Sequence, residues 1–375
     1  MSPKHRLRVL QVCSAREAVY GAAISLLTLA RAQRSAGHRV EFATFKGKRF
    51  GTQVRAQGFA AHEFAVRTKI DPFAIVQMAK TIRQGRFNIV HTHLSTSSVN
   101  GTLAAKLARV PSVATVHGLS GKLSFAAADR LIAVSDEVKS HLMGQGVPAS
   151  RIQVVYNGLD LDGLSFDADE ARTRLGFDDA GPVLGTVARV TSLKGIEDGI
   201  RVASELRDEF PGLRYLVVGD GDAMDSCRTL ANDLGMREMV HFAGYQPDVA
   251  PFLAAMDLFL FPSHKEAMGI ALVEAMAAGL PIVATRVGGI PEVVTPETGV
   301  LKPAQDVVSL AEAARELLLD SPRRIELGAN ARARAMAVFS AQAMEEGVEK
   351  VYCDLLGHGP LTRRKATRRE TRVRV

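Results

Sequence analysis

Two glutamates eight residues apart, Glu266 and Glu274, could do chemistry together with the helix start between them, whereas their spacing alone carries no information. Glu274 lies in the run Ile270–Ala278, in which every other residue is apolar. This composition predicts a helix that is covered on both sides and carries one carboxylate. Gly269 precedes the run, at a helix start where free backbone amides can approach an anion. At about 1.5 Å per residue, Glu274 would lie roughly 6–8 Å along the axis from those amides.

A buried carboxylate needs a partner, and two kinds of partner are open for Glu274. A buried Arg or Lys of the chain would satisfy it as an ion pair, as happens with most buried acids. A ligand with a phosphate at the helix start and a hydroxyl-rich group on each side would instead meet both glutamates. A nucleotide sugar has that shape, because its ribose diol suits one carboxylate, its pyrophosphate the amides and its hexose the other carboxylate.

The elements that must position the glutamates are two short apolar runs on either side of the predicted helix. Leu258–Phe261 is entirely apolar and ends at Pro262, and Leu280–Thr285 is a second apolar run with an early proline. Gly279 separates the helix from the second run. This order predicts a strand, a helix and a strand, which together form a βαβ unit.

The same stretch resembles a known family signature. The spaced glutamates are followed by Ala-Met-Ala-Ala-Gly-Leu-Pro at 275–281 and Val-Gly-Gly-Ile-Pro-Glu at 287–292. In this combination they resemble the donor site of the retaining glycosyltransferases of family four, whose fold is called GT-B. The resemblance covers the chain to about Leu356. It implies an α/β protein with two Rossmann-like domains facing each other across a cleft and a C-terminal helix crossing back to the first domain.

The length of 375 residues is sufficient for two domains that each bury a core. We expect an N-terminal acceptor-side domain over residues 1–160 and a C-terminal donor domain over residues 161–340. A crossover helix over 341–358 and a basic, disordered tail over 359–375 would follow.

The first predicted domain opens with a strand, Arg8–Cys13, and a helix, Ala22–Ser35. The loop between them has no G-x-G-x-x-G motif, which argues against an NAD enzyme. Relatives of the resembling family usually have a Gly-Gly pair at this loop, and here the pair is Gly21 and Ala22. The resemblance implies contact with the acceptor or the donor phosphate, whereas the residues alone are equally compatible with a simple turn that starts a helix.

Three histidines follow predicted strands of this domain: His91, His93 and His117. Ligands of open parallel sheets lie at the carboxyl ends of strands, which favours His117 before Gly118. A lone histidine is more often a satisfied core or loop residue. The pair His117-Gly118 resembles the family's motif at the cleft between its domains, which implies a hydrogen bond to the donor sugar. We interpret His91 and His93 as structural or cleft-lining residues, because two histidines without a nearby carboxylate are weak indications of a metal site.

The second predicted domain opens with the strand Val183–Ala188, followed by Arg189 and Lys194-Gly195. Two cations at a strand end and at the next helix start can hold one diphosphate, although cations are also common in surface loops. The Arg-x4-Lys-Gly pattern is also that of the family, which implies that Arg189 and Lys194 bind the diphosphate. In the family the base pocket lies near Gly244 and Tyr245.

The resemblance also implies the reaction, which is transfer of a sugar, of the hexosyltransferase type, from a nucleoside diphosphate sugar, most commonly a UDP- or GDP-sugar. Glu266 would hold sugar hydroxyls and Glu274 the ribose. The departing diphosphate would be stabilised by Arg189, Lys194 and the amides of the nucleotide-binding stretch. The donor-binding residues of that stretch are Gly269, Ile270, Ala271 and Glu274. Retention of the anomeric configuration is implied, with no metal or other cofactor.

Two other classes of protein remain open. One is a nucleotide-sugar epimerase or hydrolase on the same scaffold, and the other is a non-catalytic nucleotide-sugar-binding subunit. The second is suggested by Ala267 and Met268, where the family tends to have Gly or Pro and Phe. For a transferase, a glycan or lipid-linked acceptor is implied, in bacterial lipopolysaccharide, exopolysaccharide or other glycoconjugate biosynthesis.

Charge and cysteine content indicate where the protein acts. The formal charge is +7, and residues 363–374 hold seven basic side chains against Glu370, which leaves +1 for the rest. Such a tail is most often a solvated, disordered end, and docking on anionic lipid is the sharper hypothesis. The absence of Trp gives no support to nucleic-acid binding. Three separated cysteines and no apolar run long enough for a membrane span or signal sequence indicate the cytoplasm, with peripheral contact at the inner membrane face.

Overall fold

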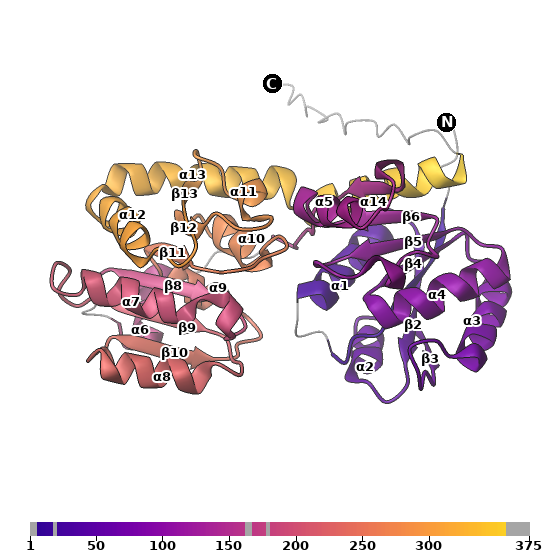
Figure 1. Cartoon of the computed structure of the whole chain (residues 1–375), viewed down its shortest axis with the longest axis horizontal. Coiled ribbons are helices and arrows are strands. Elements are labelled where there is room, and N and C mark those ends of the chain that lie inside the picture. Colours follow the sequence, from indigo (N-terminus) through magenta and orange to yellow (C-terminus); the bar gives the residue numbers. More distant parts are fainter. Residues whose placement is uncertain (1–5, 18–20, 162–166, 178–180, 358–375) are drawn as a thin grey trace, which may run out of the picture.

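The structure is a computed structural model that describes residues 6–17, 21–161, 167–177 and 181–357. It contains two wholly parallel sheets, each flanked by helices (Figure 1). The first has seven strands in the order β3-β2-β1-β4-β5-β6-β7, and the second has six in the order β10-β9-β8-β11-β12-β13. Each is a Rossmann-like unit, as the sequence predicts.

The first unit alternates strands and helices along the chain. Its strands are β1 (Arg8–Cys13), β2 (Arg39–Phe45), β3 (Ala60–Phe64), β4 (Ile89–His93), β5 (Ser112–Val116), β6 (Arg130–Ala133) and β7 (Ile152–Val154). Its helices are α1 (Gly21–Ser35), α2 (Arg49–Ala56), α3 (Pro72–Gly85), α4 (Ser95–Ala108) and α5 (Asp136–Gly144), with the 3-10 turns η1 (Lys122–Ser124) and η2 (Ala149–Arg151). The central strands β4 and β5 are fully buried although they carry polar residues such as His91, His93 and Thr115, which therefore need hydrogen-bond partners inside the unit.

The second unit repeats the alternation. Its strands are β8 (Val183–Val187), β9 (Arg214–Val218), β10 (Val240–Gly244), β11 (Leu258–Phe261), β12 (Ile282–Thr285) and β13 (Gly299–Lys302). Its helices are α6 (Ala168–Leu175), α7 (Ile196–Leu206), α8 (Met224–Asp233), α9 (Ala250–Ala254), α10 (Ile270–Ala277), α11 (Ile290–Val293), α12 (Val307–Leu319) and α13 (Ser321–Val338), with η3 (Ser192–Lys194). The predicted βαβ unit around the glutamates is confirmed as β11-α10-β12.

Some elements were not predicted, because their sequences lack the usual signals. β3 reads Ala-Ala-His-Glu-Phe and lies at the sheet edge, so only Phe64 of its five residues is buried. β13, at the edge of the second sheet, is likewise only partly covered. Edge strands need fewer apolar residues than central ones, which makes them hard to recognise from the sequence alone.

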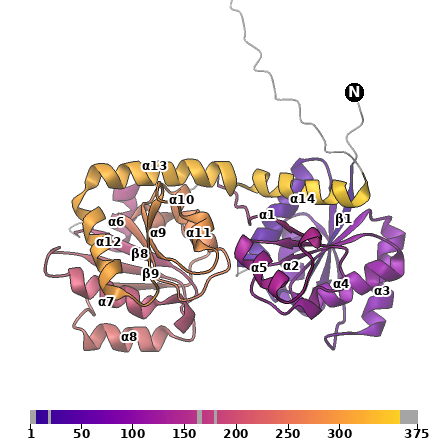
Figure 2. The ribbon, with the colours of Figure 1, turned by 45° about the horizontal axis from the view of Figure 1, so that its top comes forward.

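The last helix, α14 (Ala341–Leu356), leaves the second unit and packs on the first, which confirms the predicted crossover. Figure 2 shows α13 and α14 following one another along the same side of both sheets. The chain passes between them beside Gly158, where a Cβ atom would lie 2.4 Å from the carbonyl oxygen of Ser340. Glycine is therefore required at Gly158 for this close approach.

The carboxyl ends of the two sheets contact each other. Glu292, after β12, accepts hydrogen bonds from the backbone N–H groups of Asp136 and Glu137 at 2.7 and 3.0 Å. These amides begin α5, so a carboxylate caps a helix of the other unit. Among the described residues, no helix is both long enough and apolar enough to cross a membrane.

Candidate active site

The start of α10 provides the anion-binding geometry that the sequence predicts. Gly269 precedes the helix with φ of 92°, a left-handed conformation that favours glycine. The first turn leaves the N–H groups of Ile270 and Ala271 outside the helical hydrogen-bond ladder. These amides point out of the helix end and carry the positive end of its dipole. They offer a phosphate two donors without any further rearrangement.

Glu274 lies one turn further along α10 and is half-buried. Across the part of the chain that the structure describes, no ion pair and no side-chain hydrogen bond to Glu274 occurs. Burial, and secondarily the negative charge of Asp248, raises the pKa of Glu274 from 4.5 to about 7. The internal Arg or Lys partner that would have made this residue structural is therefore missing from the described residues. A carboxylate in this state is typical of a ligand site.

Glu266 and Lys194 are in direct contact. Nζ of Lys194 forms an ion pair and hydrogen bond with Oε2 of Glu266, and the amide of Ala267 donates to Oε1 at 3.0 Å. The sequence analysis assigned these residues to two parts of one ligand, the sugar and the diphosphate. The structure brings the two side chains together after the end of β11.

The loop that carries Lys194 is clamped against the end of β11. Gly195 follows Lys194 with φ of 62°, and a Cβ atom there would lie 2.0 Å from the carbonyl oxygen of Pro262. The amide of His264 donates to the carbonyl of Leu193 at 2.9 Å. These contacts hold Lys194 beside Glu266, so the glycine of the Lys-Gly pair is needed for backbone packing.

The paired glycines 288 and 289 press against the Glu266 loop from the other side. A Cβ atom on Gly288 would lie 1.8 Å from the carbonyl oxygen of Glu266, and one on Gly289 would lie 2.1 Å from that of Ala267. The N–H of Gly289 donates to the Glu266 carbonyl at 3.2 Å. Any side chain at either position would therefore displace the loop that aims Glu266.

The remaining predicted donor residues line the same edge of the second sheet. Arg189 follows β8 and is exposed, and Tyr245 follows β10 and is half exposed. The amide of Gly219, after β9, donates to the carbonyl of Gly244 at 2.8 Å. Because β10, β9, β8 and β11 are neighbours in that order, Tyr245, Arg189 and Glu266 succeed one another along one edge. The structure thus brings together the residues predicted for base, diphosphate and sugar.

Gly219 and Gly221 were weak signals in the sequence, and the structure gives them a packing role. A Cβ atom on Gly219 would lie 1.8 Å from the carbonyl oxygen of Ala188, and one on Gly221 would lie 2.0 Å from that of Val190. The two glycines therefore flank Arg189 and allow the chain after β9 to approach its loop.

The predicted acceptor loop meets the start of α10. A Cβ atom on Gly21 would lie 2.7 Å from Cδ1 of Ile270. Gly21 and the half-buried Ala22 form the first residues of α1, and residues 18–20 lie outside the described part of the chain. The loop after β1 and the donor helix are therefore neighbours across the two units.

His117 follows β5 at the same junction and is neutral near pH 7. Burial lowers its pKa to about 4, although the adjacent side chain of Asn157 opposes the shift. Its Nε2 lies 3.1 Å from Nδ1 of His93. His91 and His93 are buried inside the first unit, and burial lowers the pKa of His91 to about 3 and that of His93 well below 6.5. Both pack inside the first unit, and His93 also lines a small cavity beside His117.

A metal ion has one candidate position among the described residues, away from the predicted donor residues. His38 Nε2 lies 3.7 Å from Glu345 Oε1 and 3.3 Å from Glu349 Oε1. Nδ1 of His38 accepts a hydrogen bond from the amide of Leu7 at 3.3 Å, which places the proton of a neutral ring on Nε2. A protonated Nε2 has no lone pair for a metal, so the trio is better described as a histidine within ion-pair distance of two acids.

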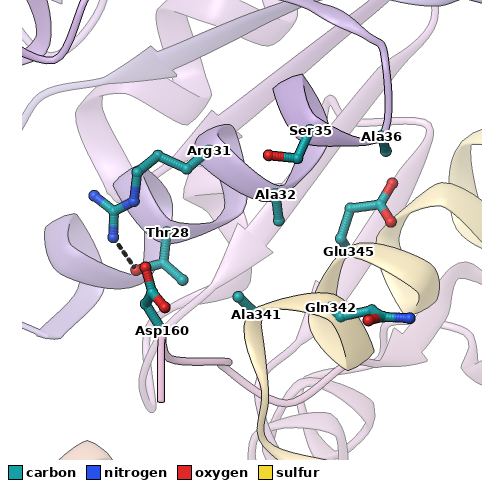
Figure 3. Close-up of a pocket in the computed structure, with 9 residues that line it drawn as sticks. All are labelled: Thr28, Arg31, Ala32, Ser35, Ala36, Asp160, Ala341, Gln342 and Glu345. Atoms are coloured by element: carbon teal, nitrogen blue, oxygen red, sulfur yellow. Dashed lines mark hydrogen bonds between the residues drawn. The ribbon is translucent and has the colours of Figure 1, made fainter. Parts of the chain in front are cut away.

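A pocket lies near that trio, between α1, the chain around Asp160 and the start of α14 (Figure 3). Its lining includes Arg31, which donates to Oγ1 of Thr28 at 3.1 Å, and Glu345 on the facing helix. None of the predicted donor-site residues lines this pocket. It belongs to the packing of the crossover helix rather than to the candidate active site.

Glu292 is a residue whose role the sequence analysis missed. It was quoted as part of a family motif but was given no role, whereas it joins the two units at α5. Together with burial, its charge raises the pKa of Tyr156 to about 12. The available signal was the start of the predicted helix at Asp136, which needs an acceptor for its first amides.

The sequence matches known protein families over most of its length. The family described as Glycosyl transferases group 1 matches residues 167–334, and the family described as Glycosyltransferase Family 4 matches residues 19–162.

Individual relatives and solved structures agree with these matches. A D-inositol 3-phosphate glycosyltransferase of Nocardia farcinica is 32% identical over 320 residues, which cover 76% of this chain and 71% of the relative. The lipopolysaccharide core biosynthesis glycosyltransferase LpsE of Rhizobium meliloti is 31% identical over 180 residues, covering 48% of this chain and 51% of that protein. The crystal structure of HepE from Anabaena in complex with UDP has a TM-score of 0.84 at 22% identity, covering 93% of this chain and all of that one.

Proposed function

Because this chain belongs to the family 4 (group 1) glycosyltransferases, we propose that it transfers a sugar from a nucleoside diphosphate sugar to an acceptor hydroxyl with retention of anomeric configuration. The observation that supports a nucleotide sugar as the donor is the environment of Glu274. It is a half-buried carboxylate with raised pKa and no ion-pair partner among the described residues, one turn from free helix amides. A ribose diol above a diphosphate satisfies both features.

The bond that breaks joins the anomeric carbon to the diphosphate, and its electron pair leaves with the diphosphate oxygen. Arg189, Lys194 and the amides at the start of α10 stabilise this negative charge from positions fixed before the reaction. Glu266 accepts hydrogen bonds from sugar hydroxyls and fixes the anomeric carbon toward the acceptor. The new bond forms to the acceptor oxygen on the side of the first sheet, near Gly21 and His117, and the proton of the acceptor hydroxyl passes to the departing diphosphate.

Positive protein groups take the place that a divalent metal has in other transferases, so we propose a metal-independent reaction. Glu266 pairs with Lys194, and neither Glu266 nor Glu274 belongs to a group of three potential metal-ligand atoms among the described residues. Within the described ranges, three potential metal-ligand atoms approach one another only at His38, on the crossover-helix side. Activity that is unchanged by excess EDTA would agree, whereas loss of transfer restored by a divalent cation would contradict this point.

The donor is identified by thermal unfolding in the presence of UDP-, GDP- and ADP-sugars. A ligand at a hundred times its dissociation constant adds about 2.7 kcal/mol of stability, which is a large shift for a single domain. We expect one nucleotide series to raise the unfolding temperature, and the Glu274→Ala variant to lose the increase. If no nucleotide sugar shifts unfolding at millimolar concentration, the proposal fails.

Transfer is distinguished from epimerisation or hydrolysis by analysing products with the donor alone. A transferase leaves the donor nearly intact until an acceptor hydroxyl is supplied, because no other nucleophile is held beside the anomeric carbon. Rapid conversion of the sugar, or rapid release of free sugar, without acceptor would support the alternatives. Proton NMR of the transferred sugar then reports whether the anomeric configuration is kept.

For the acceptor we propose a glycan or lipid-linked hydroxyl of a bacterial envelope polysaccharide or lipopolysaccharide. The similarity to LpsE, named for lipopolysaccharide core biosynthesis, supports this class. The similarity to D-inositol 3-phosphate glycosyltransferases supports a second class, a small phosphorylated polyol. Transfer assays with both kinds of acceptor and a radiolabelled sugar decide between them, since the label enters either an organic-soluble or a water-soluble product.

We also propose that the protein binds peripherally at the inner membrane face. Besides the basic tail, exposed apolar residues on and just before α3 support this position. Phe73 and Val76 on α3 are 83% and 59% exposed, and Ile70 just before the helix is 58% exposed. Lys69 and Lys80 flank them and are also exposed. An apolar strip between cations suits an anionic bilayer, as does the basic tail, which lies outside the described residues.

Sedimentation with anionic vesicles tests this position with a matched control. Phe73→Glu and truncation after Gly359 should each reduce binding, whereas Ile325→Glu should not. Ile325 is also strongly exposed, at 70%, but lies on α13 of the second unit. Equal sedimentation of all these variants would contradict membrane contact through either surface.

A further inference from the structure

A continuous chain of buried polar side chains runs behind His117 and is not used by the donor site. We call it the histidine relay, and it consists of Gln11, Gln33, His91, His93, Thr115 and Tyr352. All six are buried, and they come from β1, α1, β4, β5 and the crossover helix α14. Burial of this many polar groups is costly unless they form hydrogen bonds, and each of the six side chains has at least one hydrogen-bond partner within the set.

The two glutamines give the relay a direction. Nε2 of Gln11 donates to Oε1 of Gln33 at 2.9 Å, so Oε1 of Gln11 is the atom that faces Nε2 of His93 at 2.9 Å. An amide oxygen only accepts, so His93 carries its proton on Nε2. The pKa of His93 lies well below 6.5 because the ring is buried, so Nδ1 carries no second proton.

The same direction continues to His117. The unprotonated Nδ1 of His93 lies 3.1 Å from Nε2 of His117, and it must receive a proton from that nitrogen. His117 is also neutral, so its Nδ1 is left as a lone pair. This Nδ1 is buried and makes no hydrogen bond of good geometry among the described residues, although the side chain of Asn157 lies close enough to raise the pKa of the ring. His117 lines a small cavity together with Ser25 and Asn157.

The other end of the relay is closed by the crossover helix. Nε2 of Gln33 donates to the hydroxyl of Tyr352 at 3.2 Å, and that oxygen lies 2.6 Å from Nδ1 of His91. Nε2 of His91 lies 2.7 Å from Oγ1 of Thr115. Tyr352 is therefore the hydrogen-bond partner of the Gln33 side-chain amide at this end of the relay.

We propose that the histidine relay positions His117 by fixing the tautomer in which Nδ1 is unprotonated, so that His117 accepts a hydrogen bond from a substrate hydroxyl. The relay residues do not touch the substrate and act only through His117. The inference rests on the proposed function in one respect, namely that His117 meets the substrate. It assigns a role in the chemistry to Tyr352 on α14, although none of the predicted donor-site residues lies on that helix.

Removal of one hydroxyl should disturb the relay without unfolding the protein. In Tyr352→Phe, the side-chain amide of Gln33 loses its hydrogen-bond partner, so its oxygen and nitrogen can exchange positions. The side-chain amide of Gln11 and the proton of His93 then rearrange in turn, and His117 populates both tautomers. Tyr215→Phe is the matched control, because Tyr215 is equally buried and its hydroxyl bonds to Oγ1 of Thr186 at 2.7 Å in the other unit.

Long-range proton–nitrogen NMR of histidine-labelled protein reads the tautomers directly, with His117→Gln used to assign the signals. We expect His117 to be protonated on Nε2 alone in the native protein and in Tyr215→Phe. In Tyr352→Phe we expect a mixture of the Nε2-protonated and Nδ1-protonated neutral tautomers, in slow or fast exchange. We also expect Tyr352→Phe to lower kcat/KM about twofold, because about half of the His117 population is then in the wrong tautomer, with nucleotide affinity unchanged.

Two results would overturn the proposal. One is a native His117 protonated on Nδ1, which would mean that the relay runs in the opposite direction. The other is a Tyr352→Phe protein in which His117 keeps a single tautomer. If the tautomers behave as expected but His117→Ala transfers sugar at the native rate, the relay is upheld and the role of His117 in the proposed function is what fails.

Discussion

The carboxyl edges of the two sheets contact each other but carry different kinds of polar group. The edge of the second sheet carries charges, with Lys194 paired to Glu266 and Arg189 exposed nearby. The edge of the first sheet carries His117, which is neutral and held by other neutral groups. The difference suggests that the two edges have different roles. The charges of the second edge stabilise a departing diphosphate, and the neutral ring of His117 at the first edge, with a fixed tautomer, orients a hydroxyl.

The division follows from the physics of burial. Charges remain useful at the second edge because they are partly exposed and paired, so they are not neutralised. At the first edge, burial has lowered the pKa of each of the three histidines. A neutral histidine supplies direction rather than charge, and its direction must be set by its neighbours.

The largest expected effect comes from the charged edge. Lys194→Ala should lower kcat by about 100- to 1000-fold, because it removes a preorganised charge from the leaving group. Lys265→Ala, the exposed neighbour of Glu266, is the control and should leave kcat unchanged. Steady-state kinetics with the identified donor make this measurement. A Lys194→Ala enzyme with near-native kcat would remove the electrostatic role of this edge.

Glu274 allows a sharper test, because its effects on stability and on activity should have opposite signs. Its pKa is raised from 4.5 to about 7, so the folded protein binds this proton more tightly than the unfolded chain. Stability is therefore lost as the pH rises from about 4.5 to 7. Glu274→Gln should remove that loss and stabilise the protein at pH 8 by on the order of 2–3 kcal/mol, with little change at pH 4.5.

The same Glu274→Gln substitution should lower donor affinity about tenfold, because the ribose loses an ionised acceptor. Urea unfolding at the two pH values and nucleotide titrations at pH 8 provide the measurements. Glu205→Gln, at an exposed position of α7, controls for the loss of one negative charge. A Gln variant that is both less stable at pH 8 and unchanged in donor affinity would show that Glu274 is a structural residue.

The neutral edge should give a smaller effect. His117→Ala removes one hydrogen bond to the substrate, so we expect kcat/KM to fall about tenfold while the affinity for the free nucleotide stays the same. His141→Ala, on α5 of the same unit, is the comparison variant. An effect as large as that of Lys194→Ala would mean that His117 carries charge in the transition state, and the contrast between the edges would not hold.

The smallest expected effect is at the contact that joins the edges. Glu292→Gln keeps the shape of the side chain but removes its charge from the start of α5, which costs about 1 kcal/mol. Donor affinity should be unchanged and transfer reduced a few-fold, because the two edges meet less tightly. If the variant instead loses donor affinity, Glu292 acts within the donor site and not between the units.

The second sheet was more predictable from the sequence than the first. Its site residues occupy short loops directly after strands, so Arg189, Glu266 and Gly269 are marked by the end of an apolar run and by glycine. The apolar run around Glu274 also indicated its burial correctly. The contact between Lys194 and Glu266 could not be predicted, because it depends on how the loops after β8 and β11 pack through Gly195.

The histidine relay of the first unit could not be predicted from the sequence, because its residues come from distant segments of the chain. Gln11, Gln33 and Tyr352 are separated by up to 319 residues in hydrogen-bonded pairs and look like isolated polar residues in apolar runs. Only the path of α14 over the first sheet brings them together. Sequence periodicity identifies which side chains are buried, but the partners of a buried polar group depend on the tertiary structure.

The central claim is tested most directly by a crystal structure of the protein with the nucleoside diphosphate sugar selected by thermal unfolding. The account predicts the diphosphate at the amides of Ile270 and Ala271, the ribose diol within hydrogen-bonding distance of Glu274, and Lys194 in contact with the diphosphate. A donor bound elsewhere, with Glu274 making no contact to it, would contradict the account.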